Sequence, residues 1–457
     1  MKILFCASEV APFAKTGGLA DVTGSLPPAL GRLGVKVRLM MPRYRGVAFS
    51  EKKIARNVEI HCVEHEGYFN RSGIYGQARG DYSDNLERFS FFCEQALLKA
   101  KETGFRPDIV HAHDWQTALL PVLLKTRFSG DPFFRNTKSV LTIHNLAYQG
   151  HFPAHRFGAL GLDPGLFSVS AFEFYGKINL LKGGILFADR LNTVSPAYAR
   201  EMETREYGFG LEGVVKSRRA VLGGILNGID NRLWNPSADR RLAARFSASR
   251  QAGKADCKAA LQRACGFDPD PAVPLFGFVS RLAEQKGVDI LAEAAEHFLQ
   301  KKAQFVLLGE GDAVYHTLFG NLGARHPDRA KVIPGFDPRR AHEIYAGSDF
   351  FLMPSLFEPC GLGQLISFRY GTLPVVRATG GLADTVVDAD EDARRGNGFV
   401  FAERRATALL GAIDRACAAY RDPGRMRRLR ARVMKLDFSW AASAQAYLEF
   451  YKETVRS

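Results

Sequence analysis

An apolar run, a polar loop, a short helical segment, a second apolar run and a Gly-Gly turn follow one another between Asp349 and Gly381. The two apolar runs, 349–353 and 373–376, have the length of buried strands, and the segment 364–370 between them is predicted to form a helix. Pro and Gly residues mark the ends of these elements. A strand, a helix and a second strand in this order predict a parallel sheet, because the helix must carry the chain back to the edge where the first strand began.

The loop of this unit carries a single carboxylate, Glu358. In a parallel sheet the loops at the carboxyl ends of the strands gather at one crevice, where the first turn of the next helix offers unpaired N–H groups. Glu358 is therefore placed to accept hydrogen bonds from sugar hydroxyls while nearby N–H groups contact phosphate. A solvated acidic loop that caps a helix is the alternative. The backbone that would provide these N–H groups belongs to Cys360, Gly361, Leu362 and Gly363.

The same alternation of apolar runs and helical segments occurs in both halves of the chain. It predicts an α/β protein with two doubly wound, Rossmann-like domains that face each other across a cleft. A stretch without apolar runs, 237–271, separates the halves, so we expect an N-terminal domain over 1–236 and a C-terminal domain over 237–436. Apolar residues at helical spacing predict a terminal helix within 437–457. Further expected strands are 3–6, 35–41, 139–143, 190–194, 222–226, 275–279 and 305–308.

The chain of 457 residues is basic, with 62 Lys and Arg against 48 Asp and Glu and a net charge of +14. This balance suits nucleic acid, but it equally suits small anionic substrates. The densest basic run, Arg425 to Lys435, has apolar residues at helical spacing and so predicts a solvated helix face. Since no basic strand is interleaved with aromatic residues, we expect no nucleic-acid partner.

No apolar stretch reaches 18 residues, so no membrane span is expected. The N-terminal residues predict a first buried strand instead of a signal peptide. Seven cysteines are scattered along the chain and never form a C-x-x-C pair. This pattern favours reduced thiols and a cytoplasmic location over a disulfide framework or a zinc site.

A glycine turn follows the first apolar run and leads into a predicted helix over 22–33. A strand, a glycine turn and a helix form an arrangement that holds phosphate, and Lys15 would be free to pair with a phosphate oxygen. Gly17, Gly18 and Asp21 belong to the same predicted substrate-binding turn. Because the turn matches neither G-x-x-x-x-G-K-[ST] nor G-x-G-x-x-G, it does not indicate a P-loop or a dinucleotide site.

A His-x-His-Asp sequence ends a predicted strand near residue 113, precedes a predicted helix over 116–125, and resembles a metal cluster. On a strand, however, His111 and His113 point to one face while Asp114 points to the other, and no fourth ligand is nearby, so we expect no metal. Asp114 is better explained as an acceptor of hydroxyl groups at the crevice. His144 follows the predicted strand 139–143 and is placed to meet a ligand, with a structural hydrogen bond as the alternative.

Two cations, Arg281 and Lys286, lie in the loop that follows the first strand of the second half. The simplest alternative is a solvated surface pair. Both residues are nevertheless expected at the same sheet edge as Glu358, where they could bind a diphosphate. Arg would contribute a planar bidentate fork, and Lys would contribute a compact point charge.

Long motifs follow one another between residues 15 and 387: KTGGLADV, HAHDW, TIHNLAYQG, EFYGKINLLKGGI, NTVSPAYAREM, YGFGLEGV, GILNGID, SRLAEQKGVD, PSLFEPCGLGQL and YGTLPVVRATGGLADTV. They resemble bacterial glycogen synthase and plant starch synthase of the ADP-glucose type. The resemblance implies the glycosyltransferase B fold and transfer of glucose, with retention and without a metal or another cofactor. The donor would be ADP-glucose, and the acceptor would be the non-reducing 4-OH of an α-1,4-glucan such as glycogen or a maltooligosaccharide.

The resemblance also implies roles for individual residues. Lys15, Arg281 and Lys286 would bind the diphosphate, and Phe336 would lie against adenine. Glu358 and the backbone of 360–363 would hold the donor sugar. The other side of this sugar would be lined by Asp114, His144 and Asn227. The residues expected to carry catalysis are Glu358, Arg281, Lys286 and His144. The terminal helix would pack back on the N-terminal domain.

Three other functions remain open at the level of the sequence. UDP-glucose is the main alternative donor. A nucleotide-dependent oxidoreductase would also use doubly wound domains, but the turn after the first predicted strand does not have the G-x-G-x-x-G fingerprint that such an enzyme carries there. A glucan-binding protein without activity would have no need of Arg281, Lys286 and Glu358 at one sheet edge.

Overall fold

The structure is a computed structural model that describes residues 1–77 and 80–457. The chain forms two compact units, one from residues 1–228 and 440–457 and one from residues 229–439. Each unit has its own hydrophobic core. The predicted pair of doubly wound domains is confirmed as two α/β units, each built on a sheet. Within the described residues, no helix has the length and apolar character needed to cross a membrane.

In the described part of the first unit, eight strands form one sheet in the order β13-β12-β8-β7-β1-β2-β4-β3. All neighbouring strands are parallel except β3, which runs antiparallel to β4 at the edge. The central strand β1 is buried and pairs with β2 and β7, so that Ile3 lies opposite both Val37 and Ile109. The strands are β1 (Lys2–Cys6), β2 (Lys36–Pro42), β3 (Glu51–Ala55), β4 (Val58–Val63), β7 (Ile109–His113), β8 (Lys138–Ile143), β12 (Arg190–Thr193) and β13 (Leu222–Gly224).

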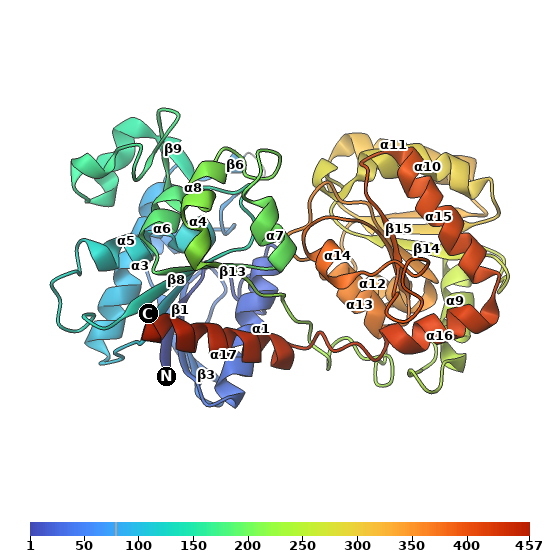
Figure 1. Ribbon diagram of the computed structural model, residues 1–457, viewed down its shortest axis with the longest axis horizontal. Helices are drawn as coiled ribbons and strands as arrows, with labels where there is room; N and C mark the ends of the chain where they lie inside the picture. Colours follow the sequence, from blue (N-terminus) through green and yellow to red (C-terminus); the bar gives the residue numbers. More distant parts are fainter. Residues whose placement is uncertain (78–79) are drawn as a thin grey trace. The chain divides into compact units, whose positions relative to one another are not determined.

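Helices flank this sheet in two groups that follow from its strand order. The chain moves in one direction from β1 to β2 and in the other from β7 to β8, and right-handed crossovers then place the connecting helices on opposite faces. Helix α1 packs against the C-terminal helix α17, as Figure 1 shows in blue and red, whereas α3, α5 and α6 pack together. The helices are α1 (Gly18–Arg32), α2 (Glu66–Phe69), α3 (Asn85–Glu102), α4 (Asp114–Thr117), α5 (Leu119–Lys125), α6 (Leu180–Phe187), α7 (Pro196–Glu201), α8 (Glu212–Ser217) and α17 (Trp440–Arg456).

Two helices of the first unit differ from the sequence prediction. Helix α1 begins at Gly18 instead of residue 22, and Asp21 in its first turn favourably faces the positive end of the helix dipole. The predicted helix 116–125 is divided into α4 and α5, because Pro121 has no N–H to donate to the carbonyl of Thr117. Small elements complete the unit: β5 (Gly76–Gln77), β6 (Gly80–Asp81), β9 (His151–Pro153), β10 (Glu173–Phe174), β11 (Lys177–Asn179), η1 (Ala154–Leu160), η2 (Pro164–Leu166) and η3 (Arg219–Val221).

The second unit contains a sheet of six parallel strands, in the described residues, with the order β16-β15-β14-β17-β18-β19. Helices α10, α11 and α15 pack together, and α9, α12 and α13 form another group. The strands are β14 (Leu275–Val279), β15 (Gln304–Gly309), β16 (Ala330–Pro334), β17 (Phe350–Met353), β18 (Leu373–Arg377) and β19 (Phe399–Phe401). The helices are α9 (Ala252–Cys265), η4 (Glu284–Lys286), α10 (Val288–Leu299), α11 (Ala313–Arg325), α12 (Pro338–Gly347), α13 (Gly363–Arg369), α14 (Gly380–Thr385), α15 (Ala406–Tyr420) and α16 (Pro423–Val433).

The segment that precedes α9 belongs to the second unit, so the expected boundary at residue 236 falls inside that unit. Trp234 stacks on His342 with ring centroids 4.0 Å apart, and the carboxylate of buried Asp239 accepts a 2.7 Å hydrogen bond from Tyr370. These contacts depend on side chains that are distant in sequence, which is why composition alone misplaced the boundary. The basic run on α16 is confirmed as an amphipathic helix, whose buried residues are Met426, Leu429 and Val433.

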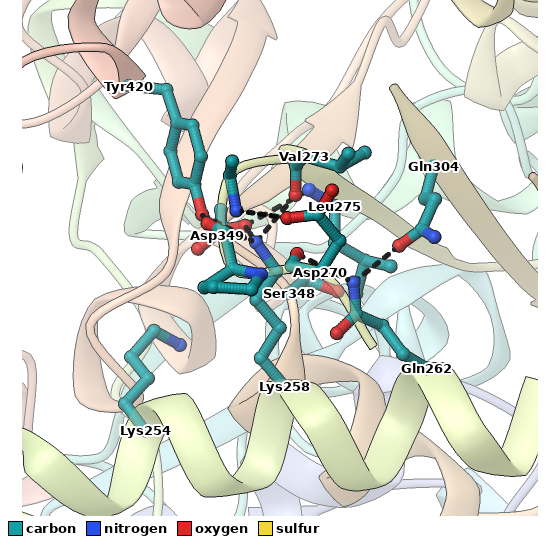
Figure 2. Close-up of polar contacts among 12 residues, drawn as sticks. Lys254, Lys258, Gln262, Asp270, Val273, Leu275, Gln304, Ser348, Asp349 and Tyr420 are labelled. Atoms are coloured by element: carbon teal, nitrogen blue, oxygen red, sulfur yellow. Dashed lines mark hydrogen bonds and ion pairs between the residues drawn. The ribbon is translucent and has the colours of Figure 1, made fainter. Parts of the chain in front are cut away.

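A buried ionic network anchors the start of β17, the strand that leads to Glu358. Asp349 is 2% exposed and accepts a 2.8 Å contact from Lys258 of α9 and a 2.5 Å contact from Arg430 of α16. Oδ2, the oxygen that contacts Lys258, also accepts a hydrogen bond from the backbone N–H of Leu275 on β14, whereas Arg430 contacts Oδ1. Figure 2 shows Lys258 extending from its helix toward Asp349 and Tyr420. The network ties two helices and two strands together.

Candidate active site

The predicted site residues of the first unit lie at one edge of its sheet. They follow the carboxyl ends of β1, β7, β8 and β13, the first three of which are neighbours in the sheet. Buried Glu9, which the sequence analysis missed, organises the turn after β1. Its carboxylate accepts hydrogen bonds from Thr16 N at 2.5 Å, from Thr16 Oγ1 at 2.7 Å and from the hydroxyl of Tyr75 at 2.6 Å. A carboxylate three residues after the first strand was the available signal.

Lys15 is not free, which corrects the sequence prediction. Its ammonium group pairs with Asp21 Oδ1 at 2.6 Å, and both side chains remain substantially exposed. The adjacent glycines show a different feature. Gly17 has an extended backbone, and a Cβ added at Gly17 or Gly18 would meet nothing within 4 Å among the described residues. Packing within the unit therefore does not require glycine here, and the open space allows a ligand to approach the backbone closely.

Asp114 begins α4 with a positive φ of 56°, a conformation that non-glycine residues rarely adopt. Its Oδ1 accepts a 2.7 Å hydrogen bond from the backbone N–H of His144, so the ends of β7 and β8 are linked. Burial raises the pKa of Asp114 to about 7 against the opposing effect of backbone hydrogen bonds from His144 and Asn145. Backbone strain of this kind is concentrated at functional sites.

Three histidines form a continuous cluster behind this edge. The rings of His111 and His113 lie 4.1 Å apart, and His113 Nδ1 contacts His144 Nε2 at 2.9 Å. Burial lowers the pKa of His144 to about 3 and also lowers the pKa values of the other two, so all three rings are neutral near pH 7. Only His144 is partly exposed, and it is therefore the member of the cluster that a ligand can reach.

Asn227 follows β13 and is 6% exposed. Its side-chain oxygen Oδ1 is buried and has no hydrogen-bond partner among the described residues. A buried polar group without a partner is costly, and native proteins rarely retain one without a reason. A hydroxyl group of a bound ligand would satisfy this acceptor.

In the second unit the structure brings Lys286 and Glu358 together. The Lys286 ammonium group lies 2.7 Å from Glu358 Oε2, which also accepts a 3.1 Å hydrogen bond from Ser355. Glu358 is 6% exposed. Gly287 has a φ of 67°, and a Cβ there would collide with the carbonyl oxygen of Pro354, so only glycine allows the two loops to approach this closely.

Arg281 lies in the same loop as Lys286, at the carboxyl end of β14, and is exposed with a 3.5 Å contact to Gln285. Phe336 follows β16 at the same edge of the parallel sheet, and its side chain is 77% exposed. A large aromatic ring held in solvent at this edge can stack on a flat ligand group. The loop after β14 thus presents two cations, Arg281 and Lys286, the second of which pairs with Glu358 of the loop after β17. The loop after β16 presents the aromatic ring of Phe336.

The loop from Cys360 to Gly363 is fixed by contacts with later residues. The side-chain amide of Gln364 donates to the carbonyl oxygens of Cys360 and Gly361 at 2.9 and 3.0 Å. The backbone N–H of Gly381 donates to the carbonyl oxygen of Glu358 at 3.0 Å. Gly361 has a φ of 74°, which favours glycine. Leu362 is the N-cap residue of α13. The Gly-Gly turn therefore supports the Glu358 loop, a role that the sequence analysis did not assign.

The described residues contain no group of three or more His, Cys, Asp or Glu side chains that could hold a metal ion. The arrangement at the two sheet edges suits another kind of chemistry. Cations and exposed N–H groups can bind phosphate, while Asp114, His144 and Glu358 can exchange hydrogen bonds with hydroxyl groups. Together, such groups can stabilise negative charge that develops on a phosphate and can hold a polyhydroxylated ligand.

Comparison with known proteins gives the same picture along the whole chain. A family model described as the starch synthase catalytic domain matches residues 2–217, and one described as glycosyl transferases group 1 matches residues 268–432. The glycogen synthase of Syntrophotalea carbinolica is 47% identical over 479 residues and covers 100% of this chain and 99% of its own. Glycogen synthase 2 of Geobacter sulfurreducens is 48% identical over 476 residues, and the match covers 99% of this chain and 98% of that protein.

Among solved structures, the catalytic domain of starch synthase IV from Arabidopsis thaliana, bound to ADP and acarbose, superimposes with a TM-score of 0.90. It is 34% identical, and the match covers 100% of this chain and 99% of that one. Sucrose-phosphate synthase from Thermosynechococcus elongatus, at 17% identity and a TM-score of 0.66, shares the fold. The expected glycosyltransferase B fold is thereby confirmed. The chain belongs to the glycogen and starch synthase family, glycosyltransferases that elongate α-1,4-glucans.

Proposed function

We propose that this enzyme transfers glucose from ADP-glucose, with retention of configuration, to the non-reducing 4-OH of an α-1,4-glucan such as glycogen. The bound ADP and acarbose named for the Arabidopsis starch synthase IV structure support this donor and this class of acceptor. The seven cysteines, all within the described residues, are thiols and not disulfides, which suits a reaction in the cytoplasm.

The second unit, in this proposal, binds the nucleotide sugar. Arg281 and Lys286 contact the diphosphate, and the exposed ring of Phe336 lies against adenine. Glu358 accepts hydrogen bonds from the donor sugar. The remaining contacts to the sugar come from the backbone of Cys360, Gly361, Leu362 and Gly363.

The first unit serves the acceptor side and completes the donor contacts. Lys15 exchanges its partner Asp21 for a phosphate oxygen, and the open backbone at Gly17 and Gly18 receives the ligand. The sugar is further held by Asp114, His144 and Asn227. No metal ion or other cofactor takes part in the proposed reaction.

The chemistry follows from where charge develops. Departure of ADP leaves positive charge on the sugar ring and negative charge on the phosphate, so cations at the diphosphate stabilise the transition state more than the ground state. We propose that the acceptor attacks from the same face, assisted by the leaving phosphate, which retains the configuration. Loss of one such charged contact typically slows the reaction by about 10²-fold or more.

The observation that carries the proposal is the 2.7 Å pair of Lys286 and Glu358, with Arg281 in the same loop as Lys286. A structural ion pair alone would not require an exposed arginine beside it. A cation next to a carboxylate at one sheet edge instead matches a ligand in which a diphosphate adjoins a sugar.

The experiment is an assay of the purified protein with glycogen and either ADP-glucose or UDP-glucose, with and without EDTA. We expect release of ADP, dependence on glycogen, no effect of EDTA, and a labelled product that α-amylase digests. Glu358→Gln should lower the rate by about 10²-fold, whereas Ser355→Ala, which removes only a neighbouring hydrogen bond, should not. Release of UDP instead would assign the other donor, and release of neither nucleotide would overturn the proposal.

A further inference from the structure

His113 is buried, does not reach solvent, and lies directly behind His144 in the first unit. Its backbone is fixed, since Thr117 Oγ1 accepts from the His113 N–H and donates to the His113 carbonyl oxygen at 2.8 Å. The rings of Phe5 and His111 pack against its ring at 4.2 and 4.1 Å. The His113 ring therefore has little freedom to turn, and its Nδ1 atom is held 2.9 Å from His144 Nε2.

Only one proton can lie between these two nitrogens when both rings are neutral. If His144 donates, the proton of His113 must sit on its own Nε2, which is buried and has no hydrogen-bond partner among the described residues. If His113 donates, that buried Nε2 is an unused acceptor instead. Buried N–H groups without a partner are rarer in proteins than buried acceptors without one. The second arrangement is therefore favoured, with His113 as the donor.

His111, the third histidine of the cluster, has hydrogen-bond partners for its ring nitrogens and does not depend on His113 for them. The hydroxyl of Tyr451 on α17 lies 2.7 Å from His111 Nδ1, and Thr142 Oγ1 lies 2.7 Å from His111 Nε2. Both nitrogens of His111 thus have partners other than the neighbouring histidines. The hydrogen bond between His113 and His144 is consequently independent of α17, and Tyr451 provides a control position.

We infer that His113 is a positioning residue that holds His144 as the Nδ1–H tautomer, so that His144 meets the donor sugar as a hydrogen-bond donor. The inference rests on the proposed function, because it requires His144 to contact that sugar. No described residue bonds His144 Nδ1, and the His144 side chain is partly exposed, so its proton is available to a hydroxyl or ring oxygen. The second nitrogen of a histidine commonly sets the tautomer in this way.

The tautomer can be measured in the intact protein without substrate, from the ring ¹⁵N chemical shifts of histidine-labelled enzyme. The His144 signals are identified by their loss in His144→Gln. We expect the proton on Nδ1. A proton on Nε2 overturns the inference whatever the activity, whereas failure of wild-type enzyme to release ADP would overturn only the proposed function.

Two variants of similar shape test the consequence for catalysis. His113→Asn retains a donor near the position of Nδ1, whereas His113→Leu has none. We expect His113→Leu to shift His144 toward the Nε2–H tautomer that imidazole prefers in water and to lower kcat about tenfold or more. His113→Asn should keep the tautomer and recover kcat to within about threefold of the wild type.

Tyr451→Phe controls for the loss of a buried hydrogen bond in the same cluster. It should lower the unfolding temperature without changing the tautomer of His144 or kcat. Equal losses of kcat in the Leu and Asn variants, with the tautomer unchanged, would reduce His113 to a packing residue.

Discussion

At the scale of single residues, two of the three cations expected to bind phosphate already have carboxylate partners. Lys15 pairs with Asp21 and Lys286 pairs with Glu358, at 2.6 and 2.7 Å. The first pair is exposed and so contributes little to stability, whereas the second is largely buried. A phosphate ligand can therefore replace Asp21 at small cost. At Lys286, by contrast, a phosphate ligand would bind while the buried pair with Glu358 stays intact, because the fold holds that pair in place.

Lys15→Ala should lower the rate of ADP release or the affinity for the donor by about 10²-fold, because a charged contact to the leaving phosphate is lost. Lys125→Ala is a matched control. Lys125 is also 47% exposed and also pairs with an aspartate at 2.6 Å, but it lies at the end of α5, where no site residue is expected. Steady-state kinetics of both variants would test this. Equal, mild effects would make Lys15 an ordinary surface lysine.

Asp114 predicts a dependence of stability on pH. Burial raises its folded-state pKa to about 7, above the value of about 4 in an unfolded chain. The folded protein thus binds the proton more tightly, so this group lowers stability progressively as the pH rises from about 4 to about 7. Asp114→Asn removes the titration and keeps an acceptor for the His144 N–H. We expect it to be more stable than wild type by at most about 4 kcal/mol at pH 8, less so at pH 5, and less active.

Asp189→Asn should show the opposite sign. Burial raises the pKa of Asp189, but hydrogen bonds from Lys125 and Ser139 outweigh burial and leave that pKa lowered. The charged form therefore stabilises the fold, and its removal should lower the unfolding temperature at pH 8. Thermal unfolding of both variants across this pH range is the measurement. A pH-independent effect of Asp114→Asn would contradict the raised pKa.

At the scale of elements, loops that carry the site depend on strands fixed from behind. The Glu358 loop continues β17, whose start is held by Asp349 between Lys258 and Arg430. Asp349→Asn leaves both cations without their charge partner and should cost about 3–5 kcal/mol in the free energy of unfolding. Asp414→Asn breaks an exposed pair with Lys301 and should cost less than about 1 kcal/mol. Denaturant unfolding compares them, and similar small losses would show that the network does not anchor the strand.

At the scale of the whole molecule, the two units have separate sheets and separate cores, so each can respond to its own ligand. We expect ADP to slow amide hydrogen exchange mainly in the second unit, in the loops 280–287, 335–337 and 354–363. Replacement of ADP by ADP-glucose should then also protect residues near Asp114 and His144 in the first unit, because the proposal assigns these residues to the donor sugar. Hydrogen exchange resolves the two units separately. Protection of the His144 loop by ADP alone would contradict this division of roles.

Much of the architecture follows from local patterns in the sequence. The strand from 3 to 6 was predicted within one residue of β1, and 275–279 coincides with β14, because short apolar runs bounded by Gly and Pro have few alternatives to a buried strand. The order of strands and helices then required parallel sheets. Residues that follow strand ends, such as Glu358 and His144, could be proposed for the site because parallel strands bring their carboxyl ends to one edge.

Tertiary structure alone decided which of these side chains meet. The pairing of Lys286 with Glu358 joins residues 72 positions apart, and the hydrogen bond of His113 with His144 joins residues 31 apart. Glu9 was overlooked since its partners come from a distant segment and a turn whose shape the sequence does not specify. Local sequence determines the conformation of a segment. Hydrogen bonds and ion pairs between segments form only when the distance between the two atoms is correct to within a few tenths of an ångström. Only the packed sheets fix those distances.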